Sequence, residues 1–251
     1  MAILHLDYMS IAIGHSLSVR VYLPHDHIDH AANKYINAEP MKTLYLLNGF
    51  HGNENDWLYL GEIIELFRQH NIAVIMPAGL NSFYIDNQDR GAKFGELIGK
   101  ELVDVTRRMF NLSTKREDTW IAGLSMGGYG ALRNGLYYND VFSVIGAFSP
   151  GVLSEDLLKQ TGGIINGFNY NRLFSQDDID LFELASTIKD QIPEIYIACG
   201  TEDFLIEPNR AFHTHLDSLG INHTYVEGTG NHDFVYWRKH IKEFVAYAIN
   251  F

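Results

Sequence analysis

One serine enclosed by glycines stands out for its chemistry, in the stretch Gly123-Leu124-Ser125-Met126-Gly127. The stretch fits the pattern G-x-S-x-G, follows the strand-like run TWIA and leads into the helix-like run MGGYGALRNGLYY. In so tight a turn the flanking positions must lack side chains, so the glycines leave Ser125 protruding. Taken alone, the pattern is also typical of a turn that packs a helix on a sheet, or of a phosphate-binding loop. The partners of Ser125 therefore decide its interpretation.

A serine hydroxyl becomes a nucleophile when a histidine takes its proton and a carboxylate holds that histidine in the right tautomer. After a G-x-S-x-G turn of this kind, the acid and then the histidine follow in chain order. Asp203 follows the strand-like run EIYIACG, and His232 lies between the run HTYVEG and the last helical pattern. Glu202 and Asp233 are rival acids by one position each. A sequence neighbour rarely orients an imidazole nitrogen, so we discount Asp233 and keep Glu202 as the alternative.

Two hydrogen-bond donors are also needed for the negative charge that develops on the attacked carbonyl. In YLLNGFHGNENDWL, Gly49 permits a turn that directs the backbone amide of Phe50 toward the place reached by the amide of Met126. Met126 lies in the first turn of the expected helix, whose dipole favours negative charge. By itself the segment is typical of an ordinary loop between a strand and a helix. Beside a triad, it predicts an oxyanion hole.

Short apolar runs alternate with helical patterns along most of the chain. Nearly continuous apolar runs, typical of parallel strands covered on both faces, occupy residues 43–48, 72–77, 119–123, 142–150 and 194–200. Apolar residues recur at helical spacing over 57–67 and 234–248. The first two strand-like runs alternate polar and apolar residues and predict an antiparallel hairpin at the sheet edge. The pattern predicts an α/β fold, with a mostly parallel sheet, helices on both faces and a site at the carboxyl ends of the strands.

The alternation is interrupted once, over residues 151–189, which are rich in glycine, asparagine and aromatic residues. A segment of this length predicts a cap-like insertion that serves as a lid or binding loop. Because no repeat or linker divides the chain, we predict a single domain over residues 1–251. A substrate pocket is mostly apolar, and four aromatic residues in the loops and the insertion are predicted to line it: Trp57, Phe168, Tyr170 and Phe174.

The composition excludes several classes of partner. The chain has 251 residues, 46% of them hydrophobic, which suffices for a substantial core. Its 19 Lys and Arg against 31 Asp and Glu give a net charge of −12, so we predict no nucleic-acid partner. No run approaches the ~18 apolar residues of a membrane span, so we predict no membrane partner. The start MAILHLDYMS lacks a secretory pattern and Cys199 is the single cysteine, so we predict a cytoplasmic protein.

Histidines gather in two places, His25, His27 and His30 in one and His213 with His215 in the other. Neither group has cysteines or a matched second cluster. We therefore predict a surface loop and a helix face there, and no metal site.

Four segments resemble the esterase D-like branch of the α/β-hydrolases, and within it the small bacterial tributyrin esterases. LLNGFHGNENDW, IAGLSMGGYGAL, CGTEDFLIEPNRAF and GNHDFVYW match that family's oxyanion, nucleophile, acid and histidine segments in order and spacing, over nearly the whole chain. The resemblance implies an α/β-hydrolase fold and favours Asp203 over Glu202 as the acid. The family commonly has His-Gly where this chain has Asn48-Gly49. Because the presumed donors are backbone amides, we expect the oxyanion hole to be retained.

These observations predict a serine carboxylesterase that hydrolyses small short-chain acyl esters through an acyl-enzyme, without a cofactor. Ser125 attacks, His232 carries the proton, Asp203 orients the imidazole, and the amides of Phe50 and Met126 hold the oxyanion. The alternatives are an S-formylglutathione thioesterase, a feruloyl or acetyl-carbohydrate esterase, and a non-catalytic hydrolase-fold binding protein. The predicted partner is a small-molecule ester, and the sequence leaves a homo-oligomer open.

Overall fold

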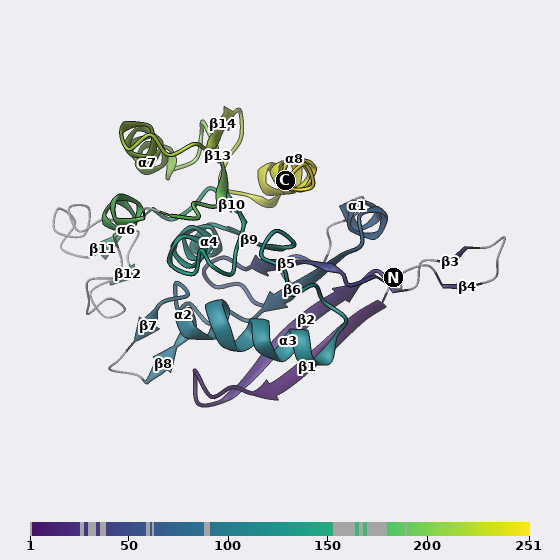
Figure 1. Ribbon diagram of the computed structural model, residues 1–251. Helices are drawn as coiled ribbons and strands as arrows, with labels where there is room; N and C mark the ends of the chain where they lie inside the picture. Colours follow the sequence, from purple (N-terminus) through teal and green to yellow (C-terminus); the bar gives the residue numbers. More distant parts are fainter. Residues whose placement is uncertain are drawn as a thin grey trace.

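The computed structural model describes residues 2–25, 28–29, 34–35, 39–58, 61, 63–87, 91–152, 164–165, 168–169, 180–188 and 190–251. An eight-stranded sheet runs through its centre, in the order β1-β2-β6-β5-β9-β10-β13-β14 (Figure 1). These strands are β1 (Ala2–Met9), β2 (Ser16–Leu23), β5 (Lys42–Leu47), β6 (Ile72–Pro77), β9 (Thr119–Leu124), β10 (Val144–Phe148), β13 (Glu194–Gly200) and β14 (Thr224–Gly228).

The strand directions and burial follow the sequence pattern. β1 pairs antiparallel with β2, and β2 pairs antiparallel with β6. From β6 to β14 all neighbours are parallel. Every residue of β6 and of β9 is buried, whereas β1 alternates between exposed and partly buried residues. The predicted antiparallel hairpin and the mostly parallel sheet are both confirmed.

Helices cover both faces of the sheet (Figure 1). One apolar core lies between the sheet and two helices, α1 (Ile63–Gln69) and α8 (Phe234–Ala248). The core on the other face includes residues of α3 (Leu102–Met109), α4 (Met126–Tyr137), α6 (Leu181–Thr187) and α7 (Ile206–Ser218). The short α2 (Phe94–Glu96) and the π-helical turn Leu97–Glu101 lead directly into α3. None of the helices in the described part of the chain is long and apolar enough for a bilayer crossing.

Among the described residues, three pairs of two-residue strands lie outside the main sheet. They are β3 (Ile28–Asp29) with β4 (Lys34–Tyr35), β7 (Asp86–Asn87) with β8 (Ala92–Lys93), and β11 (Ile164–Ile165) with β12 (Phe168–Asn169). The predicted cap-like insertion, residues 151–189, falls mostly outside the described residues. Its last part forms α6, which belongs to the core on the α4 side of the sheet.

The parallel strands bring their carboxyl ends to one edge of the sheet. β5 ends directly before Asn48 and Gly49, and β9 ends at Leu124, directly before Ser125. β13 and β14 end at Gly200 and Gly228, just before the loops that carry the predicted acid and histidine. Residues far apart in the sequence therefore meet at this edge.

Candidate active site

Ser125 occupies a strained turn between β9 and α4. Its φ of 53° and ψ of −117° lie outside the regions that L-residues favour. The turn is fixed by a 2.8 Å hydrogen bond from the Ser125 amide to the Phe148 carbonyl. A Cβ atom at Gly123 would lie 2.3 Å from the Gly127 carbonyl oxygen, and one at Gly127 would lie 2.5 Å from the Leu47 carbonyl oxygen. Backbone crowding thus requires both glycines, as the sequence predicts.

Ser125, His232 and Asp203 form one chain of hydrogen bonds. The Nε2 atom of His232 lies 2.9 Å from the Ser125 hydroxyl oxygen. On the other side of the ring, Nδ1 lies 2.9 Å from Oδ2 and 3.1 Å from Oδ1 of Asp203. An ionised carboxylate only accepts, so Nδ1 carries the proton and Nε2 is left to accept from the serine. This is the tautomer that a general base requires.

The environment of Asp203 keeps it ionised. Its side chain is fully buried, and burial by itself would raise its pKa. Hydrogen bonds from His232, from the Leu205 amide and from the Ser149 hydroxyl outweigh burial, so the pKa of Asp203 lies below its ordinary value. Ser149 in turn accepts a 3.1 Å hydrogen bond from the Trp237 indole. Both Ser149 and Trp237 support the acid, and the sequence analysis missed them.

The two rival acids have structural roles in the loops around His232. The Glu202 carboxylate accepts from the amide of Gly230, and the Glu202 amide donates to the Gly230 carbonyl at 3.1 Å. Glu202 therefore fixes the loop that leads to the histidine. Asp233 caps the first turn of α8, accepting from the amides of Val235 and Tyr236 at 2.9 and 3.0 Å. Neither carboxylate replaces Asp203 at the imidazole.

The predicted oxyanion donors come from backbone next to Ser125. A Cβ atom on Gly49 would lie 3.6 Å from the Ser125 Cβ and 2.5 Å from a methyl carbon of Leu124. The loop after β5 therefore lies against the nucleophile turn, and Phe50 is its next residue. Met126, directly after the serine, is the first residue of α4. Both residues therefore adjoin Ser125, and their amides remain the predicted oxyanion donors.

Asn48, which stands where the resembling family commonly has His, holds this loop in place. Its side chain is buried and its Nδ2 donates to the Gly49 carbonyl at 2.8 Å. Its Oδ1 accepts from the Gly79 amide and from the Tyr84 hydroxyl, both at 2.9 Å. Burial raises the pKa of Tyr84 well above its ordinary value, so the hydroxyl stays protonated as a donor. Asn48 thus connects the loop after β5 to the loop after β6.

The structure corrects the prediction for Trp57. This residue is 1% exposed and belongs to the core on the α8 side of the sheet. Its indole donates to the Leu47 carbonyl at 2.9 Å, and its ring packs edge-on against Phe148 and Phe234. A buried indole needs a hydrogen-bond acceptor, and the end of β5 provides one. Trp57 therefore anchors the end of β5, and the small pocket that it does line lies among Tyr22, Phe67 and Met76 and not beside Ser125.

The other predicted pocket residues are not described at side-chain level. Phe168 lies in β12, of which only the backbone is described, and Tyr170 and Phe174 lie outside the described residues. Phe204, which the sequence analysis did not select, has its ring 4.6 Å from that of His232 and is 60% exposed. In the sequence, only its position directly after Asp203 could have indicated that Phe204 lies near the active site. It is an exposed aromatic contact beside the base.

The single cysteine is not a nucleophile. Cys199 is fully buried, and burial, followed by the charge of Asp203, raises its pKa to about 12. This agrees with a small hydrophobic residue at the end of β13.

Of the histidine groups, His25 is exposed, and His27 and His30 lie outside the described residues. His215 donates to the Phe182 carbonyl at 2.9 Å.

A hydrogen-bonded Ser-His-Asp chain on a strained turn, at the carboxyl edge of a parallel sheet, is typical of serine hydrolases with the α/β-hydrolase fold. The sequence model of the putative esterase family matches residues 10–248. The chain therefore belongs to the putative esterase family, which agrees with the resemblance seen in its motifs.

Individual relatives agree with this membership. An acetyl esterase of Caldicellulosiruptor saccharolyticus is 39% identical over 254 residues, which cover 96% of each chain. The structure is similar to that of FphF, a fluorophosphonate-binding serine hydrolase of Staphylococcus aureus, with a TM-score of 0.86, 31% identity and coverage of 100% and 99% of the two chains. It is also similar to the S-formylglutathione hydrolase FrmB of the same species, with a TM-score of 0.79, 30% identity and 99% coverage of both chains. The chain is a serine hydrolase of carboxylic esters.

Proposed function

We propose that the chain hydrolyses small esters with short acyl groups, from acetyl to butyryl, through an acyl-enzyme formed on Ser125. The observation that carries this proposal is the pair of 2.9 Å contacts that join Ser125 to His232 and His232 to Asp203. The preference for short acyl groups is supported by the relative named an acetyl esterase, which is similar over nearly the whole chain.

Acylation begins when Ser125 Oγ attacks the carbonyl carbon of the ester. His232 Nε2, 2.9 Å away, takes the hydroxyl proton as the new carbon–oxygen bond forms. The carbonyl oxygen becomes an oxyanion that accepts from the amides of Phe50 and Met126. The ionised Asp203 stabilises the imidazolium through Nδ1. When the tetrahedral intermediate collapses, the alcohol oxygen leaves and takes the proton from His232.

Deacylation repeats these steps with water in place of serine. His232 removes a proton from a water molecule, whose oxygen attacks the acyl carbon. The same two amides hold the second oxyanion. The bond to Ser125 Oγ then breaks, the serine recovers its proton from the imidazolium, and the carboxylic acid leaves. Apart from the ester and this water, each step uses only groups of the chain that the structure describes.

A thioester of formate is a second candidate substrate. The similarity to S-formylglutathione hydrolase FrmB, at 30% identity over 99% of both chains, favours it. Formyl is the smallest acyl group, and a thiolate is a better leaving group than an alkoxide, so the same triad suffices. The two candidates therefore differ in their leaving group and not in their nucleophile.

Kinetics with a substrate panel tests the proposal. The panel comprises p-nitrophenyl acetate, butyrate, hexanoate and octanoate, tributyrin, S-formylglutathione and methyl ferulate. We expect the highest kcat/KM among the acetyl and butyryl esters, and Ser125→Ala to lower it by about 10⁴-fold or more. Ser218→Ala, an exposed serine at the end of α7, is the control and should keep full activity.

Two results would contradict the proposal. A kcat/KM for S-formylglutathione or methyl ferulate about tenfold above that of every short-chain ester would assign the chain to that substrate instead. Retention of more than about a tenth of wild-type activity by purified Ser125→Ala would remove the serine from the mechanism.

A further inference from the structure

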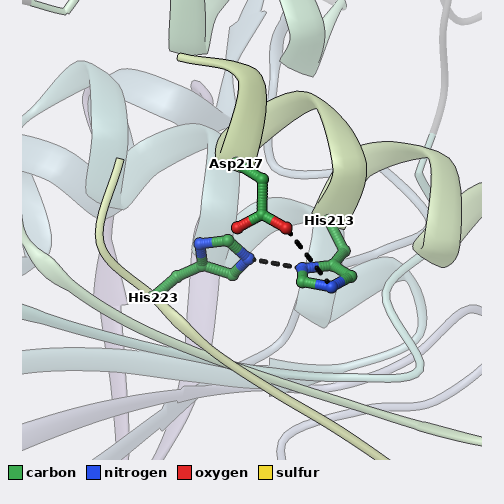
Figure 2. Close-up of side chains that lie close together, drawn as sticks. All are labelled: His213, Asp217 and His223. Atoms are coloured by element: carbon green, nitrogen blue, oxygen red, sulfur yellow. Dashed lines mark hydrogen bonds and ion pairs between the residues drawn. The ribbon is translucent and has the colours of Figure 1, made fainter. Parts of the chain in front are cut away.

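Three potential metal ligands converge between α7 and β14, away from the triad. His213 and Asp217 lie one helical turn apart on α7, and His223 lies just before β14 (Figure 2). Their nearest ligand atoms are all within 4.8 Å of one another. Gly220, with a φ of +68°, reverses the chain after α7 and so returns His223 to the side of the helix.

The hydrogen bonding of His223 directs a lone pair into this cluster. Its Nδ1 lies 2.8 Å from the Ile221 carbonyl oxygen, which can only accept, so Nδ1 carries the proton. Nε2 is then unprotonated, and it lies 2.7 Å from Nδ1 of His213. A histidine held by a backbone carbonyl at one nitrogen, with the other nitrogen unprotonated, is the form that binds metal ions.

His213 lies between two acceptors. Its ring stacks on Tyr225, with centroids 4.3 Å apart and planes inclined by 10°. Nδ1 faces the lone pair of His223, while Nε2 lies 3.6 Å from Oδ2 of Asp217 (Figure 2). A neutral His213 has one N–H and satisfies only one of these neighbours. A divalent cation interacts favourably with all three groups.

We propose that His213, Asp217 and His223 bind one divalent transition-metal ion, with zinc the best match. Two imidazoles and a carboxylate suit zinc, which takes water as a fourth ligand, whereas calcium and magnesium prefer oxygen ligands alone. Bonds of about 2.0–2.1 Å at a tetrahedral angle need the two nitrogens about 3.3 Å apart, so they must separate slightly. The side chains of Asp217 and His213 are 62% and 34% exposed, which leaves room for this adjustment and for water.

The position of the site defines its role. β14 starts directly after His223 and ends at Gly228, just before the loop that carries His232. α7 starts at Ile206, shortly after Asp203. The metal would therefore join the far ends of the two elements that adjoin the triad acid and base, without touching the reacting atoms. It stabilises the fold and takes no part in the hydrolysis.

The sequence analysis grouped His213 with His215 and predicted a helix face without a metal site there. In the structure His215 contacts the Phe182 carbonyl and the Ser186 hydroxyl instead, on the side of α6. Asp217 and His223 provide the matched ligands that the sequence analysis did not find.

Zinc titration of the full chain, after removal of metal by a chelator, tests this site. Calorimetry measures stoichiometry and Kd, and thermal unfolding measures Tm. The key variant is His213→Gln with His223→Gln. The matched control is the triple variant His25→Gln, His27→Gln and His30→Gln, which removes the other group of histidines.

We expect one zinc ion per wild-type chain and a rise in Tm of about 5–10 °C at about 100 times Kd. The triple control should bind equally well, while the double variant should lose this rise and bind at least about tenfold more weakly. Asp217→Asn, on an exposed side chain, should weaken binding with little effect on metal-free stability. If the double variant does not fold, Asp217→Asn decides in its place.

The proposal is overturned if the wild-type Kd is weaker than about 1 mM. It is equally overturned if the double variant binds like the wild type, or if the triple control is the one that loses binding. Cobalt provides a separate check. A tetrahedral Co²⁺ absorption band that survives in the triple control and disappears in the double variant supports the site, and the reverse pattern contradicts it.

Discussion

Replacing Asp203 by Asn exchanges a single oxygen for an NH₂ group, and the structure defines where that group goes. Oδ1 of Asp203 accepts from the Leu205 amide at 2.9 Å, so the amide oxygen of Asn must keep this place. The NH₂ group then takes the place of Oδ2, 2.9 Å from Nδ1 of His232. Its N–H makes Nδ1 an acceptor and moves the imidazole proton to Nε2. That nitrogen faces Ser125 and can no longer take its proton.

The variant should therefore lose the activity that depends on His232 acting as a general base, because its imidazole is held in the wrong tautomer. In a serine protease with the same triad, this exchange lowers kcat by about 10⁴-fold. At about 1.4 kcal/mol per factor of ten, the barrier rises by about 5.5 kcal/mol. Glu202→Gln is the matched control, because its amide oxygen still accepts from the Gly230 amide. We expect the control to stay within about tenfold of the wild type.

The assay is kcat/KM for p-nitrophenyl acetate at neutral pH, with circular dichroism to confirm that both variants are folded. A folded Asp203→Asn protein with activity within about tenfold of the wild type would refute the tautomer argument. A larger loss for Glu202→Gln than for Asp203→Asn would assign the acid to Glu202.

Three further outcomes are expected. Asn48→Ala leaves the buried Gly79 amide without its acceptor. Urea unfolding should therefore show a free energy of unfolding lower by about 1–3 kcal/mol, and kcat/KM should also fall. Unchanged values would show that the loop does not depend on Asn48. The lowered pKa of Asp203 means that its ionised form stabilises the fold above pH ~3.9 and that this contribution is lost as pH falls through the lower native value. The stability advantage of wild type over Asp203→Asn should therefore shrink as pH falls below about 5 and through the lowered native pKa, and a constant difference would contradict this. Finally, kcat/KM should fall beyond about hexanoyl although each methylene adds ~0.8 kcal/mol of burial, and a preference for long-chain triglyceride emulsions would contradict this steric limit.

The sheet and the triad were predictable because their signals are local. A parallel strand covered on both faces is apolar along its whole length, so runs such as 72–77 and 119–123 identify strands directly. A serine between close-packed glycines identifies the turn, chain order then identifies His232 and limits the acid to Asp203 or Glu202, and the family resemblance favours Asp203. The parallel arrangement brings these segments to one edge, which is why the structure joins them.

What the sequence did not predict depends on contacts between distant segments. Trp57 was assigned to the pocket because loop position does not reveal which face of the sheet a side chain occupies. Ser149 supports Asp203 from the end of another strand, and no periodicity indicates such a contact. In the same way, His223 meets His213 only because the chain reverses after α7.

The most direct test of the central claim is to treat the chain with a fluorophosphonate and locate the adduct by peptide mass spectrometry. We expect one adduct per chain, on the peptide that contains Ser125, formed in step with the loss of ester hydrolysis. Ser125→Ala should stay unlabelled. An adduct on another residue that accompanies the loss of activity, or full hydrolysis by a chain labelled on Ser125, would contradict the assignment of Ser125 as the nucleophile.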